Sequence, residues 1–136
     1  MKIQSSKVLA LVLGLVLGLV LGLVLGLVIA PLARAEPPAP VQQEINYLIR
    51  YIGDSGCDFK RNGAWSNSQA AAAHVRGKYD FLVKLGRIDT TLDFIAKAAT
   101  ASSLSGQPYE VRCGGDLPMR SRLWLSNELA RYQASQ

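Results

Sequence analysis

An apolar run near the N-terminus constrains this chain more than any other feature. No charged residue occurs between Val8 and Leu32, and residues 11–30 consist of the tetrapeptide LVLG four times followed by LVIA. Such a segment is typical of a targeting or membrane sequence rather than of a globular domain. The folded domain therefore has to form from the 101 residues after position 35, which are enough for one modest core.

The first 35 residues have the features of a secretory signal peptide. Lys2 and Lys7 give a positive start, the apolar run follows, and Ala33-Arg34-Ala35 places small residues at both recognition positions of signal peptidase. We therefore expect cleavage between Ala35 and Glu36 and export of the domain to the periplasm of a Gram-negative cell. No cysteine lies near this site, so a lipid anchor is not expected.

The same run leaves a second interpretation open. It exceeds the ~7–15 residues of an ordinary signal-peptide core and reaches the ~20 residues that span a bilayer. Residues 1–35 are alternatively a retained anchor in the inner membrane, with the domain facing the periplasm. Glycine at every fourth position is also the spacing of a helix-packing motif, although expansion of an apolar repeat explains it equally. We expect membrane contact only through an uncleaved leader.

The basic character of the chain comes largely from this leader. Three of the 15 basic residues and none of the 10 acidic residues lie in the first 35 positions, so the net charge falls from +5 to +2 without them. A nucleic-acid-binding domain is expected to carry a basic face or a recognition motif. The high isoelectric point is therefore not a nucleic-acid signature, and we expect no nucleic-acid partner.

The remaining chain reads as a proline-rich spacer over 36–40 and a single domain over 41–133. Apolar residues at three- and four-residue steps predict a helix over 41–52, with Gly53 directly after its end. A second helix is expected to begin at Ser66, in a capping box with Gln69, or at Ser68, and to end at Gly86. A last helix is expected over 121–132.

A third, shorter helix is expected to follow the second. Thr90 and Asp93 form a capping box at its start. Its apolar side chains are Leu92, Ile95, Ala96 and Ala99, with Phe94 beside them.

Three short strands complete the expected fold. Asn62-Gly63 is the preferred pair for a two-residue type I′ turn, which predicts a hairpin with arms at 57–61 and 64–66. Alternating apolar and polar residues predict a third strand over 109–113. The fold class is therefore α+β, with a three-stranded antiparallel sheet packed against about four helices.

The two cysteines lie at strand ends: Cys57 opens the first predicted strand and Cys113 closes the third. Cysteines in an exported domain most often pair, and a disulfide between them would join the hairpin to the third strand. A redox-active pair is not favoured, because the chain has no C-x-x-C spacing.

His74 is the one histidine and hence the first candidate for a base or a ligand. No catalytic motif, P-loop or dinucleotide fingerprint occurs, so we predict no catalytic residue and no cofactor. One histidine and two paired cysteines leave no ligand set for a metal ion. A small periplasmic hydrolase that uses His74 remains an alternative, as does a helix histidine that makes one hydrogen bond.

The stretch from Phe59 to Tyr109 resembles a family of small exported bacterial proteins, the domain of unknown function 5329, which includes the enterobacterial YfeK-type proteins. The resemblance implies an exported, periplasmic domain and implies no particular activity. It rests on five pieces that follow one another in order: Phe59-Lys60-Arg61-Asn62-Gly63, Ala73-His74-Val75-Arg76-Gly77-Lys78, Thr90 with Phe94-Ile95, Ser102-Ser103, and Ser105-Gly106-Gln107-Pro108-Tyr109.

The resemblance includes polar residues outside the expected core, and these are the candidate binding residues. We hypothesise that Arg61, His74 and Lys78 meet where the hairpin packs on the second helix. They form either a polar network that fixes the hairpin or a site for an anionic ligand or an envelope protein. The expected function is a non-enzymatic binding or accessory protein of the cell envelope, or a membrane-tethered accessory subunit if the leader is retained. The candidate residues are Arg61, Asn62, His74, Arg76, Lys78 and Ser103.

Overall fold

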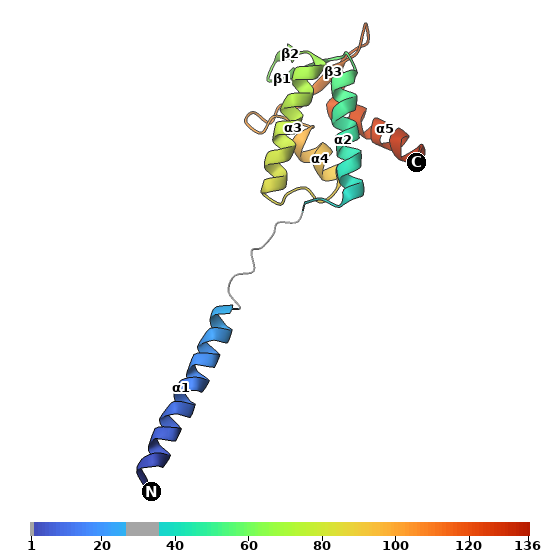
Figure 1. Ribbon diagram of the computed structural model, residues 1–136. Coiled ribbons are helices and arrows are strands. Elements are labelled where there is room, and N and C mark those ends of the chain that lie inside the picture. The colour runs from blue at the N-terminus through green and yellow to red at the C-terminus, as the bar shows by residue number, and fades with distance from the viewer. Residues whose placement is uncertain (1, 27–35) are drawn as a thin grey trace. The chain divides into compact units, whose positions relative to one another are not determined.

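The computed structural model describes residues 2–26 and 36–136 (Figure 1). The chain divides into two compact units, residues 1–33 and 34–136. Helix α1 (Lys2–Gly26) belongs to the first unit. Among the described residues, no helix combines the length and the hydropathy of a membrane span. The expected cleavage site at Ala35 lies outside the described residues.

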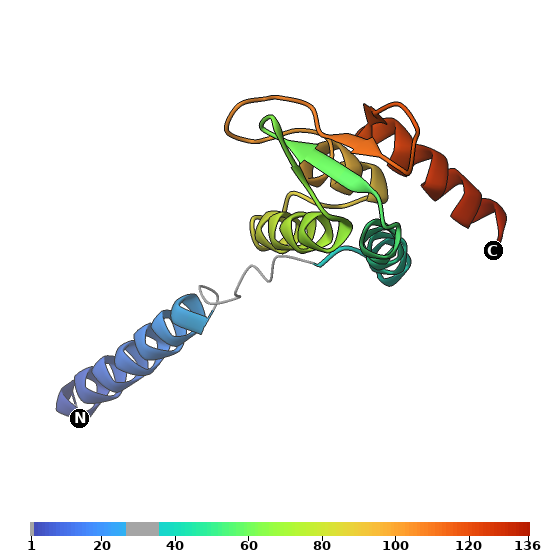
Figure 2. The same ribbon diagram turned by 90° about the horizontal axis from the view of Figure 1, so that it is seen from above.

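The second unit contains four helices and a small sheet among its described residues, so the predicted α+β class is confirmed. Helices α2 (Ala39–Asp54) and α3 (Ser68–Lys84) lie side by side, and the strands lie at one end of this pair (Figures 1 and 2). Helices α4 (Thr91–Ala98) and α5 (Ser121–Ala134) contact α2 as well. One apolar core fills the space between these elements. Its fully buried large side chains are Phe94, Ile45, Leu48, Ile52, Ile88, Ile95, Leu125 and Val111.

Helix α2 is longer than predicted at both ends. It begins at Ala39, because Pro40 in the first turn has no amide hydrogen that would be left unpaired and has a helical φ. Pro37 is buried, and its carbonyl accepts a hydrogen bond of 2.7 Å from Gln42 Nε2. The prediction of a free spacer over 36–40 is therefore wrong in part: residues 39–40 are helical and Pro37 lies against the domain.

Gly53 does not end α2 as predicted. It lies within the helix, and a Cβ atom there would meet the Cβ of Ala72 in α3 at 3.4 Å. The residue with positive φ beyond the helix is Gly56, at 64°. Glycine at position 53 thus allows α2 and α3 to approach closely rather than allowing the chain to turn.

The sheet has four strands rather than the predicted three. Strands β1 (Asp58–Arg61), β2 (Ala64–Ser66), β3 (Glu110–Arg112) and β4 (Met119–Arg120) pair antiparallel in the order β2-β1-β3-β4. The predicted hairpin is confirmed, with positive φ at both residues of its turn, 51° at Asn62 and 82° at Gly63. Strand β4 has two residues, too few to show any alternation in the sequence.

The predicted Cys57–Cys113 disulfide is confirmed. Cys57 directly precedes β1 and Cys113 directly follows β3, next to the pair Asp58 and Arg112 of the central ladder. The bond closes a long loop of the unfolded chain, which chain-entropy arguments equate with about 4 kcal/mol of stability. It ties the hairpin to the later part of the chain.

The N-cap of α3 is Asn67, and neither predicted cap holds that position. Asn67 Oδ1 accepts from the amide of Ala70 at 2.8 Å. Ser68 and Gln69 instead donate from their side chains to the carbonyl of Gly53, at 2.9 and 2.7 Å. The start of α3 is thereby fastened to the end of α2.

In α4 the predicted capping box of Thr90 and Asp93 is confirmed. The predicted apolar face of α4 is wrong in part. Leu92 and Ala96, which were expected to be buried, are exposed to solvent. The buried face follows positions 91, 94, 95 and 98, a stripe with the same helical spacing that begins on a threonine.

Candidate functional site

A pocket of about 110 Å³ opens between the β1–β2 hairpin and α3. Buried side chains from α2, β1 and α3 (Ile52, Phe59 and Val75) give it an apolar floor. Arg61 and His74 contribute polar groups to its lining.

His74 reaches this pocket from the middle of α3. Its Nε2 lies 3.2 Å from the hydroxyl of Tyr109, and the two rings meet edge to face. Burial lowers the pKa of His74 below its usual value, and the positive charges of Arg61 and Lys78 lower it further. The imidazole is therefore neutral at pH 7 and can either donate to or accept from the tyrosine hydroxyl.

Lys78 lies one helical turn beyond His74, beside the same tyrosine. Its Nζ donates to the carbonyl of Ala101 at 2.7 Å and lies 5.3 Å from the centre of the Tyr109 ring. Burial lowers the pKa of Lys78, and the charge of Arg61 lowers it further. Burial raises the pKa of Tyr109, and Arg61 opposes that rise. Arg61 is thus the common electrostatic neighbour of His74, Lys78 and Tyr109.

The positive charge at this rim is not balanced. Lys60 pairs with Glu110 at 3.5 Å and lies over the Trp65 ring. Across residues 36–136, in contrast, no carboxylate lies within ion-pair distance of Arg61 or Lys78. Two cations with no opposite charge beside a partly enclosed pocket favour the entry of an anion.

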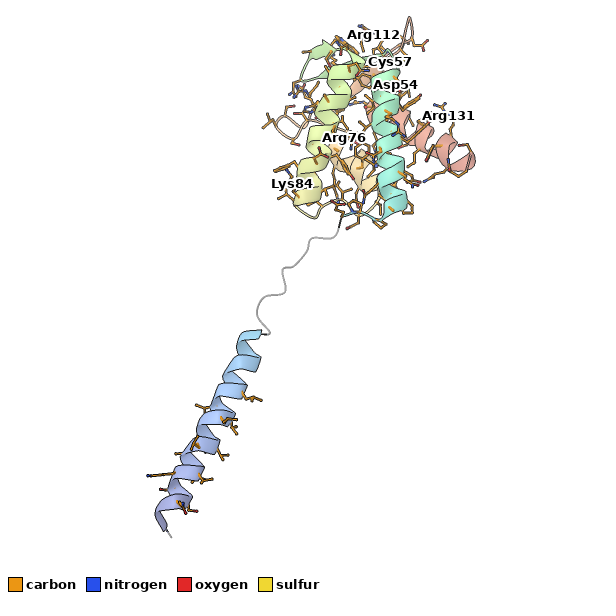
Figure 3. All side chains as sticks on the ribbon, viewed as in Figure 1. Asp54, Cys57, Arg76, Lys84, Arg112 and Arg131 are labelled. Atoms are coloured by element: carbon orange, nitrogen blue, oxygen red, sulfur yellow. A yellow bond between two sulfur atoms is a disulfide. The ribbon has the colours of Figure 1, made fainter. Side chains whose placement is uncertain are left out.

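The other predicted site residues do not line this pocket. Arg76 points to α2, where it donates to Asn46 Oδ1 at 2.8 Å and lies over the Tyr79 ring (Figure 3). Two residues after His74 on a helix, it lies on a different face. Asn62 accepts from Ser105 Oγ at 2.6 Å, which ties the hairpin turn to the loop over 102–107. Ser103 is exposed in that loop.

Tyr109 is the site residue that the sequence analysis missed. Alternation placed it at the start of a strand; in the structure it lies between the isolated bridge of Ala101 with Pro108 and the first residue of β3. Its side chain is buried and contacts both His74 and Lys78. A tyrosine at the edge of a short strand carries no local signal that would distinguish a site residue from a core residue.

A second polar cluster, also missed, lies between α2 and α5. Glu128 is 5% exposed and accepts hydrogen bonds from the Tyr47 hydroxyl and, at 2.8 Å, from Arg131 Nε. Burial raises the pKa of Glu128, but the hydrogen bonds from Tyr47 and Arg131 outweigh it and leave that pKa below its usual value. Arg131 also donates to the Tyr51 hydroxyl at 3.2 Å. These contacts join α5 to α2.

Metal binding has no support from the described part of the chain. There, no three residues among histidine, cysteine, aspartate and glutamate are grouped so that they could hold a metal ion.

Comparison with known proteins identifies the family. A family model described as a family of unknown function (DUF5329) matches residues 39–133, which is the whole folded unit from the start of α2 into α5. The chain belongs to this family. The predicted resemblance is thereby confirmed, and it extends beyond the stretch from Phe59 to Tyr109.

One curated relative of the family resembles this chain over part of its length. The uncharacterized protein YfeK of Salmonella typhimurium is 36% identical over 73 residues, which are 50% of this chain and 56% of the relative. The match thus spans little more than half the length of that protein. No solved structure matches this chain.

Proposed function

We propose that this chain is a non-enzymatic binding protein of the bacterial cell envelope that takes up a small anion in the pocket between the hairpin and α3. The observation that carries the proposal is the position of Arg61. It lines the pocket, acts electrostatically on His74, Lys78 and Tyr109, and has no carboxylate partner among the described residues.

The groups around Arg61 suit the capture of an anion. A guanidinium presents a planar fork of donors that matches a carboxylate or phosphate in a two-point contact. The neutral His74 and the Tyr109 hydroxyl share one hydrogen bond, which leaves the pair one further N–H or O–H donor. Because His74 and Lys78 already have lowered pKa values next to Arg61, an anion here would relieve repulsion between cations as well as gain its own contacts.

A polar network that merely fixes the hairpin is the main competing interpretation. His74 and Lys78 do make contacts of that kind, to Tyr109 and to the carbonyl of Ala101. Arg61 makes no side-chain hydrogen bond to any residue in the ranges that the structure describes. An exposed cation at a pocket, outside the network, supports binding over a purely structural role.

The hydrolase alternative has less support from the geometry. Within residues 36–136, the hydrogen-bond partner of His74 is the Tyr109 hydroxyl, and no serine hydroxyl or carboxylate contacts its ring. A nucleophile activated by His74 would need such a contact.

The oxidising environment that a disulfide requires supports export. The Cys57–Cys113 bond indicates a compartment outside the cytoplasm. Together with the signal-peptide pattern of residues 1–35, it supports the periplasm as the location. A membrane-tethered accessory subunit is the alternative, and the N-terminal mass of protein recovered from the envelope decides between them: a start at Glu36 supports release, whereas an intact leader supports tethering.

The experiment that tests anion binding uses protein expressed as the full chain and recovered from the cell envelope. Titration with sodium acetate or inorganic phosphate at constant ionic strength, followed by NMR, should shift the backbone amide signals of the residues that line the pocket and saturate. Arg61→Gln should abolish saturable binding, whereas Arg50→Gln, at an exposed position of α2 away from the pocket, should preserve it. Signal shifts that never saturate, or an equal loss of binding in Arg61→Gln and Arg50→Gln, would overturn the proposal.

A further inference from the structure

We propose that the ligand of this pocket is a monocarboxylate with a short aliphatic chain, its carboxylate at Arg61 and its chain on Ile52, Phe59 and Val75. This inference rests on the anion-binding function proposed above and names the ligand class. The pocket combines a cationic rim with an apolar floor. An inorganic ion would contact only the rim, and an uncharged hydrocarbon would contact only the floor.

The floor of the pocket specifies the aliphatic part. The three floor side chains are at most 7% exposed, and Ala71 beside them is 9% exposed. Together they form a concave apolar surface continuous with the core of the domain. A phosphate or sulfate ion would leave this surface to water, whereas each methylene group placed on it should tighten binding about fourfold.

The volume of the pocket limits the length of the ligand's aliphatic chain. Its volume of about 110 Å³ is smaller than the cavity of about 150 Å³ that accommodates benzene in another protein. It therefore has room for about four or five carbon atoms below the rim. Longer chains would extend past the pocket mouth, where Ala70 is exposed to solvent.

The charge at the rim specifies the head group. Of the two cations that line the pocket, Lys60 is neutralised by Glu110, so Arg61 is the one whose charge is left without a carboxylate among the described residues. Lys78 does not line the pocket, and its ammonium group donates to the backbone carbonyl of Ala101. Within the pocket lining, the one guanidinium without a carboxylate matches one carboxylate, and a dianionic phosphate monoester would bring a second charge that no cation of the lining balances.

Calorimetric titration with a homologous series tests the proposal. The probes are sodium acetate, butyrate, hexanoate and octanoate, with butyl phosphate as the dianionic comparison, all with envelope-recovered protein at constant ionic strength. We expect affinity to rise about fourfold per methylene up to hexanoate and then to level off, and butyl phosphate to bind more weakly than hexanoate.

Two matched variants of α3 test whether the aliphatic chain of the ligand lies in the pocket. Ala70→Leu adds bulk at the mouth, and Ala73→Leu adds the same bulk at an exposed position of the same helix that does not line the pocket. We expect Ala70→Leu to weaken hexanoate binding at least tenfold and by a larger factor than it weakens acetate binding, and Ala73→Leu to change neither, with folding checked by circular dichroism.

The outcomes separate this inference from the function on which it rests. If acetate and hexanoate bind with equal affinity, or if Ala70→Leu leaves hexanoate binding intact, the ligand class is wrong and anion binding stands. If no probe binds in a way that depends on Arg61, the proposed function itself fails.

Discussion

The hydroxyl of Tyr109 lies 3.2 Å from Nε2 of His74, and this contact joins the approach to β3 to the middle of α3. The two residues are 35 positions apart in the chain. The amide of Tyr109 also donates to the carbonyl of Thr100 at 2.8 Å, which fixes the tyrosine from its backbone side. The rim of the pocket is therefore held by the fold before any ligand arrives, which reduces the ordering that binding requires.

Substitutions of His74 and of Arg61 at the pocket rim are expected to affect stability and anion binding differently. His74→Ala removes one hydrogen bond between uncharged groups and should lower the free energy of unfolding by about 1 kcal/mol. Arg61→Gln removes no hydrogen bond and should change that free energy by less than about 0.5 kcal/mol while it abolishes anion binding. Urea unfolding and acetate titration of both variants measure the two effects. A large loss of stability in Arg61→Gln would assign the residue to the structural network instead.

Anion affinity is expected to increase at acidic pH. Because the pKa of His74 lies below 6.5, the imidazole is neutral at pH 7 and gains its proton only as the pH falls through that lowered value. The added positive charge lies beside the pocket and should tighten binding of a carboxylate that is still ionised. Titrations from pH 7.5 downward should show this gain in the native protein and not in His74→Gln. The same pH profile in both proteins would refute a role for His74 in binding.

Reduction of the disulfide is expected to destabilise the domain strongly. The Cys57–Cys113 bond constrains the unfolded chain, so its loss should lower the free energy of unfolding by up to about 4 kcal/mol. Urea unfolding of oxidised and reduced protein at one pH gives the difference directly. Identical transition midpoints would show that the sheet is held by its packing alone.

The buried carboxylate of Glu128 is expected to hold α5 on α2. Glu128→Ala would leave the Tyr47 hydroxyl and Arg131 without their shared acceptor and should cost about 2 kcal/mol of stability. Asn127→Ala, at the exposed neighbouring position, is the control and should be close to neutral. Thermal unfolding compares the two, and equal melting temperatures would contradict the assignment.

Features of this fold that depend on residues close together in the sequence could be predicted, whereas features that depend on distant residues could not. The Asn62-Gly63 turn and the Thr90–Asp93 capping box depend on residues within four positions of one another, and both were predicted correctly. The N-cap of α3 was not, because three adjacent polar residues are all competent caps. Tertiary hydrogen bonds to the carbonyl of Gly53 recruit Ser68 and Gln69 and leave the cap to Asn67.

The site was predicted in part for the same reason. Helical spacing puts His74 and Lys78 on one face of α3, but residues shared with a family do not reveal that Arg76 points to α2. Tyr109 and Glu128 escaped prediction because their roles depend on contacts 35 and 81 residues away in the chain. A glutamate on a helix is ordinarily exposed, and only the joint presence of Tyr47 and Arg131 makes its burial favourable.

The most direct test of the central claim is the affinity of hexanoate for the native protein, Arg61→Gln and Arg50→Gln, measured by calorimetry at pH 7 and constant ionic strength. Binding at the pocket predicts a saturable isotherm with one site for the native protein and for Arg50→Gln, and at least tenfold weaker binding for Arg61→Gln. Equal affinity in all three proteins, or no saturable binding in any of them, would contradict it.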